Sequence, residues 1–193
     1  MISRIDHISL AVKNDNFSKA YDFFTKILGA TKGSHGRDKY LKYYWEILRF
    51  GDLSRIELIK PLGEGSFLSN FLKKREGVHH INLETPDIER TRKMLEEKGI
   101  PYFDYRVLGD AWKELFIHPR DAFGVLIQIA EFNPDDWLAP SDLMEKGKKW
   151  MVSKKNNKYE LTFKHPGGGK VSFDMDKEEI NKLISDLKNL IDV

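Results

Sequence analysis

An internal repeat constrains this chain more than any other feature. Residues 5–10 have the sequence IDHISL and residues 78–83 the sequence VHHINL, so the second stretch follows the first at a spacing of 73 residues. Both stretches are strand-like, and both carry a histidine at their third position. Because the same succession of elements follows each copy, we infer one structural unit used twice.

A helical pattern follows each copy of the repeat. In the first copy Asn14 or Asp15 can cap the helix and Gly29 ends it, whereas in the second residues 85–87 (TPD) form the cap and first turn and Gly99 is the end. The side chains between these ends recur at the spacing of one helix face. They are Phe17, Ala20, Tyr21, Phe24, Ile27 and Leu28 in the first copy, and Ile88, Thr91, Arg92 and Leu95 in the second.

Each predicted helix is followed by segments with the composition of β-strands, so the repeated unit is βαβββ. In the first copy these segments are residues 40–50 and 55–59, and in the second they are residues 101–108, 114–117 and 125–130.

The repeat predicts an α+β fold. We expect two βαβββ modules, residues 1–61 and 75–132, to form a curved mixed sheet around a metal site within one domain of residues 1–132. One face of each half of the sheet would pack on its helix, and the other would curve toward its twin and enclose a cavity.

The C-terminal part of the chain has a different character. We expect a linker over residues 133–142 and, over residues 143–193, an extension made of a β-hairpin and a helix. The hairpin would comprise residues 158–164 and 170–174. The final helix carries an apolar stripe, which needs the main domain or a partner chain to pack on. The stripe consists of Ile180, Leu183, Ile184, Leu187, Leu190 and Ile191.

Composition excludes several classes of protein. The 193 residues contain 32 basic and 30 acidic side chains, a net charge of +2, which gives no electrostatic case for nucleic acid. The chain shows no membrane-spanning apolar run and no secretory signal, so we expect a cytoplasmic location. It contains no cysteine, so any metal must be bound by nitrogen and oxygen ligands.

Four polar residues within strand-like segments are the candidate metal ligands. Strand parity places His7 and His80, rather than His79, on the face away from the helices. Glu57 and Gln128 interrupt apolar segments near the end of each module, and a glutamate there is costly unless something compensates it. Together they could hold one divalent ion of Co, Mn, Zn, Ni or Fe. Alternatively, each histidine is a strand residue with its hydrogen bonds satisfied.

These residues resemble the vicinal-oxygen-chelate superfamily (glyoxalase, bleomycin resistance and dioxygenase proteins), and most closely its methylmalonyl-CoA epimerase family. The resemblance covers about residues 4–132. In that family the matching ligands are His, Gln, His and Glu in chain order, which implies His7, Glu57, His80 and Gln128 here, with Glu and Gln exchanged between the modules. The segments that carry the resemblance are residues 5–8, 21–29, 77–81, 116–119 and 124–128.

The resemblance also implies catalytic carboxylates. Glu46 occupies a position similar to that of the family's remaining catalytic glutamate, although it could equally be a solvent-facing residue of an edge strand. Gln128 cannot exchange a proton, so either Glu57 takes that role from the other module or the reaction is not a two-base epimerisation.

The implied activity is a metal-dependent isomerase or epimerase acting on a proton α to a carbonyl of a small carbonyl compound or acyl-CoA, such as methylmalonyl-CoA. The alternatives are a glyoxalase I-like lyase, an extradiol-type dioxygenase that uses two histidines and one glutamate, and a non-catalytic small-molecule binding protein. The resemblance and the apolar stripe of the last helix favour a homodimer. No membrane or nucleic acid partner is expected.

Overall fold

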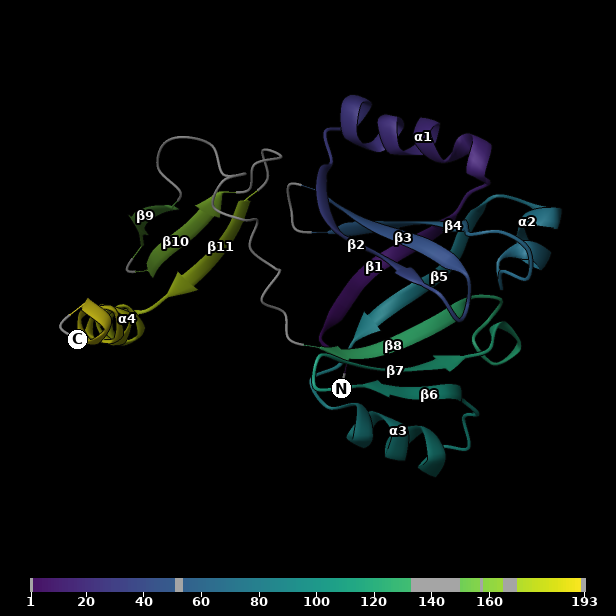
Figure 1. The fold of residues 1–193 in the computed structure, drawn as a ribbon. Coiled ribbons are helices and arrows are strands. Elements are labelled where there is room, and N and C mark those ends of the chain that lie inside the picture. The colour runs from purple at the N-terminus through teal and green to yellow at the C-terminus, as the bar shows by residue number, and fades with distance from the viewer. Residues whose placement is uncertain (1, 51–53, 133–149, 157, 165–169, 192–193) are drawn as a thin grey trace. The chain divides into compact units, whose positions relative to one another are not determined.

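The computed structural model describes residues 2–50, 54–132, 150–156, 158–164 and 170–191. These residues fall into two compact units, of which the first ends with the strand that reaches Phe132 and the second contains the residues from Trp150 onward (Figure 1). The expected linker over residues 133–142 and residues 143–149 of the expected extension lie outside the described residues. No helix among the described residues is long and apolar enough to cross a membrane.

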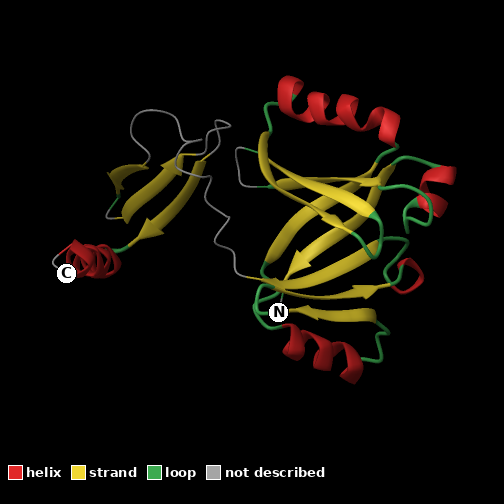
Figure 2. Cartoon of the chain, viewed as in Figure 1, coloured by secondary structure: helices red, strands yellow, loops and turns green. Residues whose placement is uncertain are grey.

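The first unit contains the two predicted βαβββ modules, and the α+β prediction is confirmed. Their strands form one eight-stranded mixed sheet in the order β2-β3-β4-β1-β5-β8-β7-β6 (Figure 2). The first module contains β1 (Arg4–Ala11), α1 (Asn14–Asp22) with a π-helical turn at Phe23–Ile27, β2 (Thr31–Asp38), β3 (Tyr43–Arg49) and β4 (Arg55–Pro61). The short helix α2 (Ser69–Lys74) connects it to β5 (Gly77–Glu84), α3 (Ile88–Glu97), β6 (Phe103–Leu108), β7 (Trp112–Ile117), a 3-10 turn at Pro119–Asp121 and β8 (Leu126–Phe132).

The strand β2 is missing from the sequence-based expectation, which placed no strand between the first helix and residue 40. Its sequence, TKGSHGRD, has no apolar alternation, so the composition resembles that of a loop. The two glycines have a packing function: a Cβ atom at Gly33 would lie 2.8 Å from the carbonyl oxygen of Ile47, and one at Gly36 would lie 2.7 Å from the ring of Trp45. Glycine therefore allows β3 to approach this edge strand closely.

The helices α1 and α3 cover one face of the sheet, as the repeat predicts, whereas Leu72 of α2 packs with Ala11 and Ile59 on the other face. Leu10 and Val12 of the first module pack in a cluster with Phe17 of α1, together with the fully buried Leu48 and Leu58. The second module forms the equivalent cluster beneath α3, and Figures 1 and 2 show the two helices on the outer sides of the curved sheet. The buried members of this second cluster are Ile88, Leu115, Ile117 and Ile129.

The second unit consists of a three-stranded sheet in the order β11-β10-β9 and one helix. The predicted hairpin is formed by β10 (Lys158–Lys164) and β11 (Lys170–Met175), and a further strand, β9 (Trp150–Lys155), pairs with the other edge of β10. The helix α4 (Lys177–Ile191) begins with reciprocal capping by Asp176 and Glu179, each of which accepts a hydrogen bond from a backbone N–H at the helix start.

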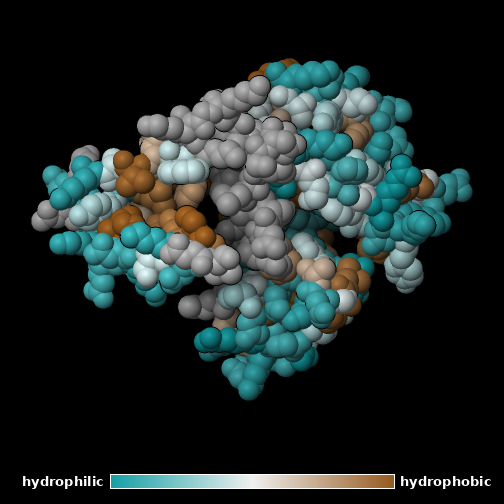
Figure 3. All heavy atoms as spheres, turned by 60° about the vertical axis from the view of Figure 1, so that its left-hand side comes forward, coloured by the Kyte–Doolittle hydropathy of each residue, from teal (hydrophilic) through white to brown (hydrophobic). Residues whose placement is uncertain are grey.

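Several side chains of the apolar stripe predicted for the last helix are exposed, and Figure 3 shows that hydrophobic side chains, in brown, reach the surface of the second unit. None of the described side chains of α4 is fully buried. Ile180 and Leu183 are half-buried, whereas the rest of the stripe is exposed on the described second unit. The exposed members are Ile184, Leu187, Leu190 and Ile191.

We expect Leu58→Ala to lower the free energy of unfolding by about 2–5 kcal/mol, because a fully buried leucine would leave a cavity between the sheet and α1. Urea denaturation followed by circular dichroism measures the change. Val107→Ala is the matched control on β6, where the side chain is 52% exposed, and should change the stability by less than about 0.5 kcal/mol. Equal effects of the two substitutions would contradict the assigned core.

Candidate metal centre

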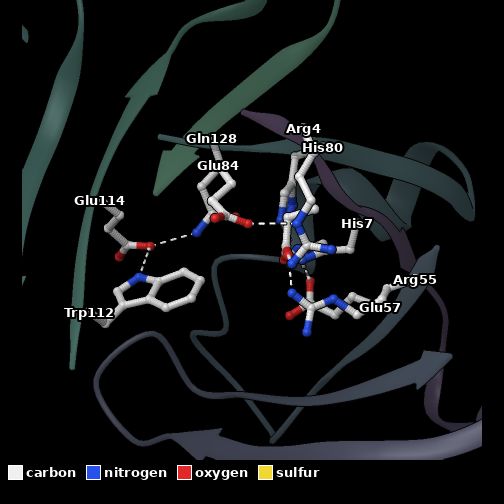
Figure 4. A network of polar contacts seen from close by, with 10 residues as sticks. Arg4, His7, Arg55, Glu57, His80, Glu84, Trp112, Glu114 and Gln128 are labelled. Atoms are coloured by element: carbon white, nitrogen blue, oxygen red, sulfur yellow. Dashed lines mark hydrogen bonds and ion pairs between the residues drawn. The ribbon is translucent and has the colours of Figure 1, made fainter. Parts of the chain in front are cut away.

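Three buried ligand-type side chains meet at the centre of the sheet: His7 of β1, Glu57 of β4 and His80 of β5. Their potential ligand atoms all lie within 4.8 Å of one another. The Oε2 atom of Glu57 lies 3.6 Å from Nε2 of His7 and 3.6 Å from Nε2 of His80. One carboxylate oxygen is thus shared between two imidazoles, as the close-up in Figure 4 shows.

The strand register brings these residues together. Ser9 of β1 pairs with Glu57 in the parallel direction and with His80 in the antiparallel direction, so Glu57 and His80 lie two strands apart in one row. In the neighbouring row Asn82 of β5 pairs with His7 on one side and with Gln128 on the other. Each row has the same pattern: a small polar residue lies between a histidine on one side and a carboxylate or amide on the other. The second row repeats the first with the two modules interchanged.

The register also decides between the two adjacent histidines. His80 lies in the cluster, whereas the ring of His79 contacts Phe67 and Phe71, with ring centroids 5.4 and 5.0 Å away. The Nδ1 atoms of the two histidines are 3.0 Å apart. Burial lowers the pKa of His79 to about 4, so its ring is uncharged at neutral pH where it contacts His80.

Asp6 orients His7, and the sequence analysis did not identify it. Its Oδ2 atom lies 2.8 Å from Nδ1 of His7, and its Oδ1 atom accepts hydrogen bonds from Arg4, at 2.9 Å, and from Arg55. An irregularity in the β1–β5 register between Ile5 and His7 accompanies the burial of two consecutive side chains. A hydrogen bond from Nδ1–H to the carboxylate leaves the lone pair of Nε2 directed toward Glu57. The detectable sequence signal was an acidic residue directly before the repeated histidine.

Both imidazoles of the cluster are held in the neutral, metal-binding form. Burial lowers the pKa of His7, against an opposing effect of Glu57. Burial, followed by the neighbouring His7 and His79, lowers the pKa of His80 well below its usual value, and the Gln128 side chain opposes this shift. Neutral histidines can donate a lone pair to a metal ion without first losing a proton.

Gln128 of β8 lies beside this cluster, with its side chain between Glu114 and the two histidines (Figure 4). Its Nε2 atom donates a hydrogen bond to Oε2 of Glu114 at a distance of 2.6 Å. Its Oε1 atom is buried and makes no hydrogen bond of ordinary geometry with the described residues, although the side chain lies close enough to His80 to oppose the lowering of its pKa. The amide is therefore oriented with its donor end engaged and its acceptor end available.

The donor set fits a divalent metal ion. Nε2 of His7, Oε2 of Glu57 and Oε1 of Gln128 are all buried without a hydrogen-bond partner among the described residues. Buried polar atoms without partners are rare in proteins, and a bound cation would satisfy all three. Two imidazoles with oxygen ligands suit Mn, Fe, Co, Ni or Zn.

The structure does not bring Glu46 into this cluster. Glu46 of β3 pairs with Leu58, which packs under α1, whereas the adjacent Ile47 pairs with Glu57. Because side chains alternate along a strand, Glu46 lies on the helix-covered face of the sheet. The face on which Glu46 lies follows from the pairing register of β3 with β4, which the sequence analysis did not determine.

Glu46 is a buried residue at the edge of a pocket of about 490 Å³ that Phe17 and Tyr21 also line. The hydroxyl group of Tyr44 donates a hydrogen bond of 2.8 Å to Oε2 of Glu46, and burial together with this bond raises the pKa of Tyr44 to about 12. The ammonium group of Lys32 lies 3.4 Å from Oε1. Glu46 is therefore neither a metal ligand here nor the solvent-facing residue of the alternative interpretation.

A curved sheet built from two βαβββ modules, with histidines from both modules at its centre, defines the class of protein. Residues 6–116 match the family model of the Glyoxalase/Bleomycin resistance protein/Dioxygenase superfamily, and the chain belongs to this superfamily. The resemblance noted in the sequence is thereby confirmed.

Several proteins that are similar to this chain are epimerases of CoA thioesters. The chain is 33% identical over 141 residues to the ethylmalonyl-CoA/methylmalonyl-CoA epimerase of Cereibacter sphaeroides, an alignment that covers 68% of this chain and 99% of that protein. It is 30% identical to the mitochondrial methylmalonyl-CoA epimerase of Bos taurus, with 67% of this chain and 75% of that protein covered. The crystal structure of methylmalonyl-CoA epimerase from Mycobacterium tuberculosis matches with a TM-score of 0.62 and 26% identity, covering 69% of this chain and 90% of that one.

We expect His7→Ala and His80→Ala each to abolish stoichiometric metal binding, because each substitution removes one of only two nitrogen ligands in the cluster. Elemental analysis of the purified proteins measures the metal content. His118→Ala is the control, because His118 is exposed and accepts a hydrogen bond from the backbone of Arg120. Metal retained by both cluster variants would exclude the assigned ligands.

Asp6→Asn should weaken the affinity for Co²⁺ by about 10–100-fold, because the carboxylate that fixes the ring of His7 is lost. Titration with Co²⁺ measures the dissociation constant. Glu84→Gln is the matched control: it removes a carboxylate that binds Arg4 at 2.6 Å in the same ion-pair network but makes no contact with His7. If both variants lose affinity equally, the charge of the network is responsible and not the orientation of His7.

Proposed function

We propose that this protein is a divalent-metal-dependent isomerase that moves a proton at the carbon α to the carbonyl of an acyl-CoA thioester, with methylmalonyl-CoA as the leading substrate. The observation that carries this proposal is the buried Glu57 carboxylate shared by two neutral histidines. It lies in a chain whose matched relatives are methylmalonyl-CoA epimerases.

The proposed chemistry requires a base at the α-carbon and stabilisation of the enolate. A divalent ion held by His7, Glu57, His80 and Gln128 would polarise the thioester carbonyl and lower the energy of the enolate. Oε2 of Glu57 faces the two histidines, so the second oxygen of the same carboxylate is the group that we assign to accept the α-proton. The C–H bond breaks, its electron pair enters the enolate and the proton passes to Glu57. Return of that proton to the same face restores the substrate, whereas epimerisation requires a proton delivered from water to the opposite face.

Burial supports this assignment. Glu57 is 7% exposed and His7 4%, so the enolate would form with little bulk water around it, and deuterium from D₂O can replace the proton on Glu57 when the site opens to solvent between turnovers. Glu57 is the only carboxylate among the four proposed ligands, because the fourth is the amide of Gln128. The amide cannot deliver a proton to the opposite face of the enolate. Proton exchange and inversion of the α-carbon should therefore be measured separately.

A second candidate activity follows from the same geometry. Two histidines and one carboxylate with their ligand atoms within 4.8 Å are also the ligand set of Fe(II) oxygenases, some of which belong to this superfamily. Oxygen consumption that depends on Fe(II) and a catechol, without proton exchange at methylmalonyl-CoA, would favour that activity. Tight ligand binding without stoichiometric metal would favour a binding protein.

Glu57→Gln and Glu46→Gln form a matched pair on adjacent strands. We expect Glu57→Gln to lower deuterium incorporation into methylmalonyl-CoA in D₂O by about 10²–10⁴-fold at saturating metal, because a general base is lost. Glu46→Gln should leave the rate within a few-fold, since that side chain lies on the helix-covered face. Mass spectrometry follows deuterium and circular dichroism follows inversion at the α-carbon. If Glu57→Gln exchanges at the native rate, the proposed base is wrong.

Three further expectations accompany the proposal. The identity of the metal, the cytoplasmic location and association into a homodimer stay predictions. The exposed stripe of α4 is consistent with association but identifies no partner.

A further inference from the structure

A second buried carboxylate lies next to the candidate metal centre, and the proposed reaction does not use it. Glu114 of β7 is 4% exposed and shares the inner face of the sheet with Gln128, because Phe116, two residues along β7, pairs with Gln128. Two side chains donate hydrogen bonds to its carboxylate, and a third forms an ion pair with it. These are Gln128 Nε2 at 2.6 Å, Trp112 Nε1 at 3.0 Å and Arg106 at 2.5 Å.

The fold itself does not require an acid at this position. In the first module Ile47 pairs with Glu57, and in the second Phe116 pairs with Gln128, so the residue equivalent to Glu114 is Trp45. An aromatic side chain thus occupies the same place on β3. Burying a carboxylate in a strand is costly, and hydrogen bonds to it reduce this cost. The asymmetry between the modules points to a local function for Glu114.

We propose that Glu114 is a positioning residue that fixes the amide of Gln128 with Oε1 toward the two histidines. The two ends of a glutamine amide are nearly equal in size, so packing alone cannot select the end that faces a metal ion. An ionised carboxylate only accepts hydrogen bonds. The flipped amide would place its oxygen against that of Glu114, whereas the observed amide places its NH₂ group there and leaves Oε1 buried without a partner.

The same contact compensates for the exchange of glutamate and glutamine between the modules. A hydrogen bond to a carboxylate polarises the amide and increases the negative charge on Oε1. Gln128 and Glu114 together would present a more negative oxygen than a glutamine alone, much as a carboxylate behind a histidine strengthens that ligand. This inference rests on the metal centre of the proposed function.

The test is Co²⁺ binding, followed by the visible absorption of the cobalt site as well as by the dissociation constant. We expect Glu114→Gln to weaken binding by about 10–100-fold and to change the spectrum, because a glutamine here must turn its NH₂ group toward one of three donors. Trp112→Phe is the control: it removes one donor to Glu114, keeps an aromatic ring to stack on Phe132, and should change the affinity by less than a few-fold.

The double variant Glu114→Gln with Gln128→Glu separates positioning from a merely structural role. It reverses the donor and the acceptor of the 2.6 Å hydrogen bond and places a carboxylate at the ligand position, so affinity should recover by at least about tenfold over Glu114→Gln. Thermal unfolding without metal shows whether each variant folds.

Each outcome tests a different statement. If the native protein binds no cobalt, the metal centre of the proposed function and this inference fail together. If the native protein binds cobalt and Glu114→Gln binds it with the same affinity and spectrum, only the positioning of Gln128 is overturned. The same conclusion follows if Glu114→Gln binds weakly and the double variant recovers nothing.

Discussion

The antiparallel pairing of β1 with β5 is the constraint on which the rest of the first unit depends. It joins the two modules across the middle of the sheet and sets His7 opposite Asn82 and Ser9 opposite His80. Each histidine thus meets a small polar residue of the other module, and β4 and β8 add Glu57 and Gln128 at the ends of the same rows. A shift of this pairing by one residue would turn each histidine of the shifted strand to the opposite face of the sheet.

Around this centre the protein buries both apolar and polar side chains. The outer face of the sheet packs its leucines and isoleucines under α1 and α3, and a smaller apolar cluster on the inner face, in which Ile59 packs with Leu72 of α2, adds to this core. The inner face also buries carboxylates, and two of them orient neutral ligand side chains: Asp6 contacts His7, and Glu114 contacts Gln128. Orientation by neighbours, together with burial, is what keeps ligand atoms available in a folded protein.

The two modules are similar in topology but not in chemistry. Where the first module has Trp45, the second has Glu114, and where the first has Glu57, the second has Gln128. The buried carboxylate of the second module, Glu114, therefore lies on β7, one strand farther from the centre of the sheet than Glu57 on β4. The duplicated fold fixes where side chains can meet, and the differences between the copies decide which of them carries charge.

The sequence by itself determined the repeat, the βαβββ order and the parity that turns His80 rather than His79 inward, because these depend on local periodicity. It did not reveal β2, since a glycine-rich edge strand lacks the apolar alternation that marks a strand. It also did not determine the pairing register of β3 with β4, which places Glu46 on the helix-covered face. Asp6 and Glu114 became recognisable only in the tertiary structure. Their importance lies in contacts with His7 and Gln128 that depend on a local irregularity in one strand and on pairing between neighbouring strands, and neither leaves a periodic pattern in the sequence.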